Sequence, residues 1–336
     1  MKKSIIASFA GVLTAAVMGV SASALADIKP AVIYDMGGKF DKSFNEGVWN
    51  GVKRFTDETG IEVMEFEVTN EAQRAQAMQR MVDRGATVVL GVGFAQADAI
   101  AGISAENPDV QFSIIDVGWL SGDNLRQYVF KEHEGSYLVG IAAAMASETG
   151  KVGFVGGMDI PLISKFACGY VGGAKSVNSD IVVYQNMTGT TPAAWNDPVK
   201  GAELTRSQID RGADVIYQAA GGTGVGVIQA AVDSGKLAIG VDSNQNGIAP
   251  GSILTSMLKR VDVAAYNTFM DAKTNSFTSG VQVLGVAEDG VGWALDDNNR
   301  SLISADMEAT IEQARADIES GKISVHNFES DMNCPY

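Results

Sequence analysis

Short runs of apolar, often β-branched residues alternate with longer amphipathic stretches along most of the chain. Each run is nearly continuous in hydrophobicity, which is typical of strands covered on both faces, as in parallel sheets. The intervening stretches, such as residues 70–86 and 134–150, carry apolar residues at helical spacing. The pattern predicts a βαβα order and a doubly wound α/β fold. The eight predicted strands lie within residues 31–38, 61–68, 87–93, 111–117, 151–157, 180–187, 214–220 and 237–242.

One helix-to-strand junction occurs twice in the sequence. "MVDRGA" precedes the apolar run "TVVLGVG", and "QIDRGA" precedes "DVIYQAA". We therefore expect two similar α/β lobes, with a ligand cleft between the carboxyl ends of their strands. No Pro-rich or low-complexity linker separates the halves, so we expect the chain to cross between lobes near Lys131, Lys259 and Gly280.

These crossings divide the mature chain into two lobes of discontinuous sequence. The predicted N-terminal lobe contains residues 27–131 and 260–280. The predicted C-terminal lobe contains residues 132–259 and 281–336.

Residues 1–26 have the three parts of a secretory signal peptide. Lys2 and Lys3 begin the segment, an apolar stretch follows, and it ends in "ALA". We expect cleavage after Ala26 and, because the segment has no cysteine, no lipid anchor. The mature protein should then be a freely soluble periplasmic chain of about 310 residues, which is enough for two lobes with a substantial core.

The charge and the rare residue types exclude several classes of function. The formal net charge is −15, and −17 without Lys2 and Lys3, which argues against nucleic acid and anionic lipid as partners. Only two histidines are present and neither is spaced as a zinc motif requires. The two cysteines, Cys168 and Cys334, can form one disulfide that ties down the C-terminal tail or can remain two thiols.

The stretch "VIYQAAGGTGVGVIQ" imitates a dinucleotide-binding turn, followed by Asp242 at the end of the next apolar run. Its glycines, Gly222, Gly224 and Gly226, are spaced G-x-G-x-G and not G-x-G-x-x-G. We favour a structural interpretation, in which glycine allows close approach of the backbone. No G-x-S-x-G elbow is present, so nothing supports an enzyme and we predict no cofactor.

Polar and aromatic residues gather where predicted strands end. Each has an ordinary structural alternative: Asp35 and Asp116 can cap helices, and Phe166 and Trp195 can fill the core. Together they converge on one cleft if the chain has two lobes. The candidate ligand-binding residues are Asp35, Phe44, Asn45, Asp116, Phe166, Trp195, Gly221, Asp242 and Lys259.

The stretch "DKSFNEGVWNG", residues 41–51, poses this choice most clearly. Asp41 or Ser43 can cap a helix on which Phe44 packs inward, or Phe44 can form a wall of the cleft.

Several motifs occur in the order seen in the basic membrane protein family, and the sequence resembles that family over essentially the whole mature chain. The motifs are "DKSFNEGVWNG", "SYLVGIAAAMAS", "PLISKFACGYVGGAK", "AAGGTGVGV", "IGVDSNQ" and "LTSMLKRVDVA". The family comprises purine-nucleoside-binding receptors of ABC importers with the type I periplasmic-binding-protein fold. The chain departs from the family where "SNQ" replaces the usual "TDQ" after Asp242, and where the lipoprotein cysteine is missing.

The resemblance implies a role for most of the candidate residues. Phe44 and Phe166 would enclose a purine ring, with Trp195 near the pocket. Asn45, Asp35 and Asp116 would meet the base edge, while Asp242 and Lys259 would hold the ribose hydroxyls.

The expected function is that of a monomeric receptor that delivers a purine nucleoside to ABC permease subunits. A sensory binding protein for another small polar solute and an exported nucleoside hydrolase remain alternatives.

Overall fold

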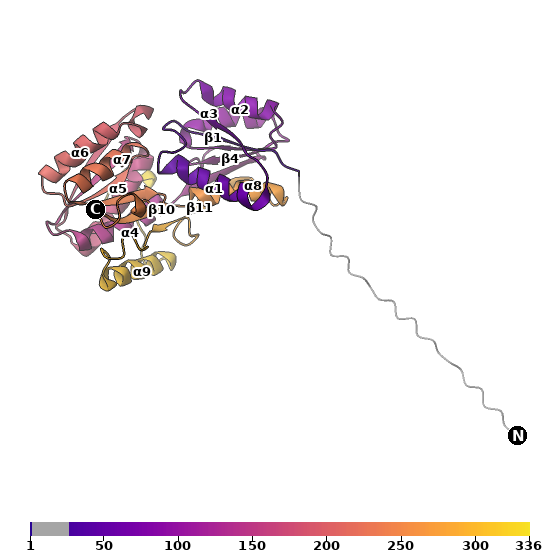
Figure 1. Cartoon of the computed structure of the whole chain (residues 1–336). Coiled ribbons are helices and arrows are strands. Elements are labelled where there is room, and N and C mark those ends of the chain that lie inside the picture. Colours follow the sequence, from indigo (N-terminus) through magenta and orange to yellow (C-terminus); the bar gives the residue numbers. More distant parts are fainter. Residues whose placement is uncertain (2–26) are drawn as a thin grey trace.

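The computed structural model describes Met1 and residues 27–336. The described chain forms two lobes, each built on a six-stranded sheet (Figure 1). The predicted α/β fold with two doubly wound lobes is confirmed. The predicted signal peptide lies, apart from Met1, outside the described residues.

The first sheet has the strand order β11-β5-β4-β3-β1-β2, and all its pairs are parallel. Helices α2 and α3 cover one face, and α1 and α8 cover the other (Figure 1). The strands are β1 (Pro30–Tyr34), β2 (Met64–Glu67), β3 (Val88–Gly91), β4 (Gln111–Ile115), β5 (Leu125–Phe130) and β11 (Gly280–Leu284). The helices are α1 (Phe44–Thr59), α2 (Gln73–Asp83), α3 (Ala97–Glu106) and α8 (Val261–Lys273), with the 3₁₀ helix η1 (Phe94–Gln96).

The second sheet has the order β12-β10-β9-β8-β6-β7, with β12 alone antiparallel to its neighbour. Helices α4 and α5 cover one face, α6 and α7 cover the other, and α9 packs on α4. The strands are β6 (Lys151–Met158), β7 (Val182–Gly189), β8 (Val215–Ala219), β9 (Leu237–Asp242), β10 (Ile253–Lys259) and β12 (Val291–Trp293). The helices are α4 (Glu132–Ala146), α5 (Pro161–Val177), α6 (Pro198–Asp210), α7 (Thr223–Asp233) and α9 (Ala305–Glu319), with the 3₁₀ helices η2 (Pro192–Trp195), η3 (Asn246–Ile248) and η4 (Phe328–Ser330).

Four strands of the structure, β5, β10, β11 and β12, were not among the predicted strands. β5 and β10 lack a continuous apolar run because they contain buried polar residues, among them Arg126 and Thr255. β11 lies at the edge of its sheet with Val281 and Val283 exposed, and β12 has only three residues. Tertiary context, and not local pattern, places these segments in the sheets.

The chain passes between the sheets at the ends of three strands. It leaves the first sheet after β5, returns to it after β10 and leaves again after β11. The first two positions agree with Lys131 and Lys259. The third prediction placed a crossing near Gly280 and assigned residues 281–336 to the C-terminal lobe. It is wrong for residues 281–284, which belong to β11 of the first sheet. β11 pairs with β5, from Gly280 with Arg126 to Leu284 with Phe130, so the crossing follows Leu284.

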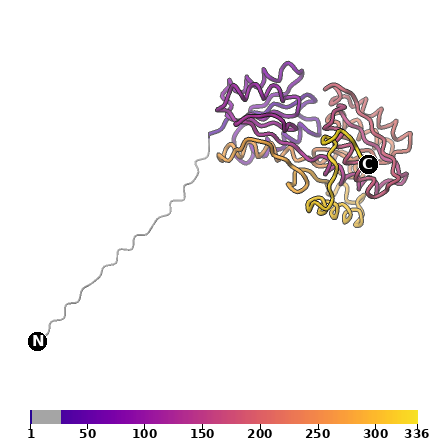
Figure 2. Tube along the Cα trace, turned by 180° about the vertical axis from the view of Figure 1, so that it is seen from behind, coloured from indigo at the N-terminus to yellow at the C-terminus, as the bar shows by residue number. Residues whose placement is uncertain are grey.

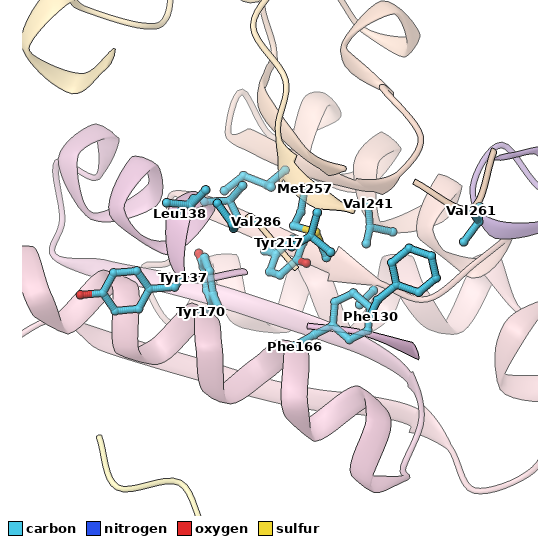
Figure 3. Close-up of a cluster of buried hydrophobic side chains, with 14 of the residues drawn as sticks. Phe130, Tyr137, Leu138, Phe166, Tyr170, Tyr217, Val241, Met257, Val261 and Val286 are labelled. Atoms are coloured by element: carbon cyan, nitrogen blue, oxygen red, sulfur yellow. The ribbon is translucent and has the colours of Figure 1, made fainter. Parts of the chain in front are cut away.

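The largest core cluster of the described residues contains side chains of both lobes and of the crossing segments. Figure 3 shows Phe166 of α5 close to Phe130, with Tyr170, Tyr217 and Met257 further along the same cluster. The ring centroids of Tyr170 and Tyr217 are 5.1 Å apart, and the Tyr217 hydroxyl oxygen lies 3.2 Å from the Ser136 hydroxyl oxygen. This packing fixes α5 relative to the ends of β5 and β10, where the candidate residues lie.

The glycines of the apparent dinucleotide motif have packing roles. A Cβ on Gly224 would lie 2.2 Å from the Gln218 side chain, and one on Gly226 would lie 1.9 Å from the carbonyl oxygen of Pro198. Close approach of α7 to its neighbours therefore requires glycine, in agreement with the structural interpretation.

The C-terminal segment returns to the second lobe and lies against α5 (Figure 2). Cys168 of α5 forms a disulfide with Cys334, with their Cα atoms 5.6 Å apart. The Tyr336 ring packs against Gly172, where a Cβ would lie 2.5 Å from the ring.

Candidate functional site

A cavity of about 650 Å³ lies between the two lobes. Its walls follow the carboxyl ends of strands of both sheets, together with the starts of α1 and α5. All nine candidate residues line this cavity: Asp35, Phe44, Asn45, Asp116, Phe166, Trp195, Gly221, Asp242 and Lys259.

Ten further residues line the cavity and were not predicted. Eight of them lie within the last three residues of a predicted strand or within three residues after it, so their position in the sequence was the available signal. Leu162 and Ile163 lie at the start of a helix and carried no such signal. The ten are Met36, Gly37, Asp41, Gly93, Phe94, Leu162, Ile163, Ala219, Gly222 and Val241.

The loop between β1 and α1 is held by Asp41. This buried carboxylate accepts hydrogen bonds from the backbone N–H groups of Ser43 (2.9 Å), Asn45 (3.0 Å) and Glu46 (3.1 Å). The three bonds satisfy donors at the helix N-terminus, where a negative charge is favourable. Both interpretations of "DKSFN" therefore hold in the structure, since Asp41 caps the helix while Phe44 lines the cavity.

The Asn45 side chain is occupied with the backbone of the same loop. Its Oδ1 accepts from the N–H of Asp35 at 3.2 Å, and its Nδ2 donates to the carbonyl oxygens of Asp35 (3.3 Å) and Gly38 (3.2 Å). Asp35 in turn accepts from Arg74 Nη2 at 3.2 Å. Burial raises the pKa of Asp35, against the hydrogen bond from Met36 and the charge of Arg74. Asn45 thus shapes the wall on which Asp35 is presented.

Lys259 is a buried lining residue of the cavity and lies among aromatic rings and carboxylates. Its Nζ is 5.2 Å from the ring centroids of Phe44 and Phe130 and 5.6 Å from that of Phe166. It also lies 2.7 Å from Asp116 Oδ1 and 2.9 Å from Glu132 Oε1. Burial alone would lower the pKa of Lys259, but the surrounding carboxylates raise it, so the ammonium stays charged.

Asp116 and Asp242 have equivalent positions in the two lobes. Asp116 follows β4 and Asp242 ends β9, and both have a left-handed backbone, with φ of 66° and 63°. Such conformations are uncommon outside glycine and occur often at functional sites. Burial raises the pKa of each carboxyl to about 6, against the attraction of Lys259.

Trp195 enters the cavity from η2 of the second lobe. Its ring lies against Gly157, where a Cβ would come within 2.2 Å of the indole, and its carbonyl oxygen is near Gly221. Gly221 has φ of 56°, which favours glycine at this turn. Gly157 was not predicted, yet its missing side chain makes room for Trp195.

Besides the contact between Lys259 and Asp116, three hydrogen bonds among the described residues join the lobes beside the cavity. The Ser43 hydroxyl donates to Asp242, the Ser243 hydroxyl donates to the carbonyl oxygen of Ser43 at 3.1 Å, and Gln245 Nε2 donates to the carbonyl oxygen of Lys42 at 2.7 Å. Gln245 is itself fixed in the second lobe, because its Oε1 accepts from the N–H of Val241. The lobes are therefore in contact around the cavity, and sequence reasoning did not single out the donor side chains of Ser43, Ser243 and Gln245 as site residues.

No group of three or more His, Cys, Asp or Glu side chains in the part of the chain that the structure describes could hold a metal ion. No helix among the described residues has the length and apolar character needed to cross a bilayer.

The family model described as "ABC transporter substrate-binding protein PnrA-like" (Bmp) matches residues 28–327. The chain is 30% identical to the ABC transporter nucleoside-binding protein BmpA of Lactococcus lactis, over 95% of both chains. It is 32% identical to basic membrane protein A of Borreliella burgdorferi, over 88% of this chain and 87% of the relative.

The fold has a solved counterpart in the same class of transporter. A solute-binding protein of an ABC transporter from Aeropyrum pernix superposes with a TM-score of 0.81 at 28% identity, over 89% of this chain and 93% of that one. The expected periplasmic-binding-protein fold is thereby confirmed. The chain belongs to the Bmp family of PnrA-like ABC transporter substrate-binding proteins.

Proposed function

We propose that the protein captures a purine nucleoside between its two lobes and presents it to the permease of an ABC importer. The observation that carries this proposal is the composition of the interlobe cavity. Phe44 from the first lobe and Phe166 from the second line it together with Asp116, Asp242 and Lys259. Flat heteroaromatic rings gain from aromatic neighbours, and a ribose diol can donate to a carboxylate. The name of the Lactococcus lactis relative supports the same ligand class.

The charges of the cavity favour a nucleoside over a nucleotide. Four carboxylates line it, those of Asp35, Asp41, Asp116 and Asp242, against the single ammonium of Lys259. That ammonium is already paired with Asp116 and Glu132. A phosphate group would meet more negative than positive charge in a poorly solvated site, which is unfavourable.

The geometry refines the roles that the resemblance implies. Asp116 contacts Lys259, so we propose that it acts at the ribose end together with Asp242. The amide of Asn45 is held by backbone groups, so we propose that it positions Asp35 at the base end. Phe44 and Phe166 keep the stacking role, with Trp195 and Gly221 closing the wall of the second lobe.

The ligand assignment is tested with Asp242→Ala and Phe44→Ala, titrated calorimetrically with a nucleoside and its free base. Asp242→Ala should lose about 2 to 4 kcal/mol of nucleoside binding and little of base binding, because it removes a charged acceptor for ribose hydroxyls. Phe44→Ala should weaken both ligands by about 1 to 3 kcal/mol, because it removes a stacking face.

Ser43→Ala is the matched control, since it removes the interlobe bond to Asp242 but keeps the carboxylate. If Asp242→Ala binds the nucleoside like the wild type, the ribose assignment fails and a different ligand is indicated.

The family supports an extracytoplasmic protein that binds a small molecule and meets a membrane transporter. We propose further that residues 1–26 are a cleaved signal peptide, that the mature protein is an unanchored periplasmic monomer, and that it catalyses no reaction. Recovery of unchanged nucleoside after prolonged incubation would exclude the hydrolase alternative.

A further inference from the structure

A chain of alternating charges runs from the cavity to the C-terminal tail. Asp116 contacts Lys259, and Lys259 contacts Glu132 Oε1 at 2.9 Å. The other oxygen of Glu132 lies 2.8 Å from Lys165 Nζ, which in turn lies 2.7 Å from Glu329 Oε2. Three carboxylates and two ammonium groups thus alternate without interruption. Only the first two members, Asp116 and Lys259, line the cavity.

The centre of this chain is buried and depends on its partners. Glu132 is completely buried, and Lys165 is nearly so. Burial alone would raise the pKa of Glu132, but Lys165 and Lys259 lower it to about 2, so the carboxylate is charged at neutral pH. Loss of one partner from such a set leaves an incompletely compensated charge, which is strongly unfavourable. The positions of Glu132 and Lys259 are therefore linked to the position of Lys165.

One partner of Lys165, Glu329, belongs to the C-terminal tail. Lys165 Nζ donates to the carbonyl oxygen of Phe130, at the first crossing, and to Glu329 in η4 of the tail. Beyond Val325 no residue of the described tail is buried. The Cys168–Cys334 disulfide supplies the covalent anchor, and Cys168 lies three residues after Lys165 on α5. The tail is thus fixed where Glu329 meets the ion chain.

We propose that Lys165 and Glu132 are positioning residues for Lys259, and that the disulfide-anchored C-terminal tail completes their support through Glu329. The tail then contributes to ligand affinity although it does not line the cavity. The ligand used to measure this effect rests on the proposed function, but the positioning itself does not.

The test compares nucleoside dissociation constants for Glu329→Gln, Lys165→Met and the double variant Cys168→Ala/Cys334→Ala. Each should weaken binding, by about five- to tenfold for the tail variants and more for Lys165→Met, since coupling of this kind is typically 5- to 150-fold. Combining Glu329→Gln with the cysteine substitutions should add little, because both act through one contact. Glu319→Gln, which makes the same charge change at an α9 carboxylate paired with Arg315, is the matched control and should bind like the wild type.

A pH profile separates positioning from a loss of general stability. In Lys165→Met, Glu132 keeps only Lys259 as a cation, so its pKa should rise. The ratio of variant to wild-type dissociation constants should therefore increase as the pH is lowered from about 7.5 to about 5. A ratio that does not change with pH contradicts the positioning role of Lys165.

Hydrogen exchange of the ligand-free protein tests the inference without any ligand. In Glu329→Gln and in the cysteine variant, amides of residues 128–133 and 256–262 should exchange faster than in the wild type. Faster exchange confined to residues 325–336, with unchanged nucleoside affinity, would overturn the proposal and show that the tail contributes only to stability. If the wild type binds no nucleoside, the proposed function fails, while the exchange experiment still decides the positioning role.

Discussion

At the scale of single residues, two carboxylates have properties that the sequence did not reveal. Asp116 and Asp242 were candidates because each closes an apolar run. The structure adds that both have a positive φ, that both side chains are almost completely buried near Lys259, and that burial raises the pKa of each to about 6. The surroundings therefore impose both the unusual backbone conformation and the raised pKa of these residues, as is common at binding sites.

Asp242→Asn should change how the stability of the ligand-free protein depends on pH. The folded-state pKa of Asp242 is raised from 3.8 to about 6, so the stability supplied by this group is present below pH 4 and is lost as the pH rises through 6. A shift of about two units corresponds to about 3 kcal/mol. Asparagine cannot ionise, so the variant does not lose this stability. As the pH is raised from 4 to 7.5, the free energy of unfolding of Asp242→Asn should therefore increase by about that amount relative to the free energy of unfolding of the wild type.

Denaturant unfolding of both proteins at several pH values measures this gain. If the difference in unfolding free energy between the two proteins stays constant with pH, burial does not raise the pKa of Asp242.

At the scale of elements, α4 and α5 pack through glycine. A Cβ on Gly140 would lie 2.3 Å from the carbonyl oxygen of Tyr170, one on Gly169 would lie 2.3 Å from that of His133, and one on Gly173 would lie 1.9 Å from that of Tyr137. The two helices therefore touch backbone to backbone. This contact sets the depth of α5, which carries Phe166 to the cavity and Lys165 to the ion chain.

Gly173→Ala should destabilise the protein, because a methyl group at this helix contact cannot be accommodated without moving α4 or α5. Overpacking of this kind costs about 1 to 3 kcal/mol. Gly102→Ala on α3 is the matched control: Gly102 is exposed and a Cβ there would meet nothing within 4 Å. The control should gain up to about 1 kcal/mol from helix propensity. Equal unfolding free energies for the two variants would contradict this account of the contact.

At the scale of the whole molecule, contacts between the lobes surround the cavity. Ser43 bonds to Asp242, and Gln245 reaches the carbonyl oxygen of Lys42. The Lys259–Asp116 contact also joins the lobes, and three crossing segments connect them covalently, which is the arrangement of a hinge. A ligand that touches both lobes stabilises the arrangement in which they meet, because only there are all its contacts made.

Saturating nucleoside should therefore reduce the radius of gyration measured by small-angle scattering. The physical reason is a shift of the population toward the form with the interlobe bonds. The free base and a ligand-free sample serve as comparisons. Identical scattering curves with and without nucleoside would show that the lobes do not open.

The sequence identified the ends of the predicted parallel strands, and this was enough to find residues from both lobes of one cavity. The C-terminal ends of parallel strands gather at one edge of a sheet, so Asp35, Asp116, Gly221 and Asp242 could be grouped before any coordinates. Gly157, although it ends a predicted strand, was not among the candidates, and neither were Ser43 and Gln245. Their importance comes from a neighbour distant in the sequence: Trp195 for Gly157, Asp242 for Ser43 and the Lys42 carbonyl for Gln245.

The sequence by itself determined the alternation of strands and helices, the two similar halves and the chemical types gathered at their strand ends, because hydrophobic period and turn residues are local properties. Only the tertiary structure decided that β11 joins the first sheet and that the Asn45 side chain forms hydrogen bonds with backbone groups. It alone also decided that Glu132, Lys165 and Glu329 connect the cavity to the tail. Edge pairing, hydrogen-bond partners and buried ion chains depend on which distant segments meet, and no local pattern encodes that meeting.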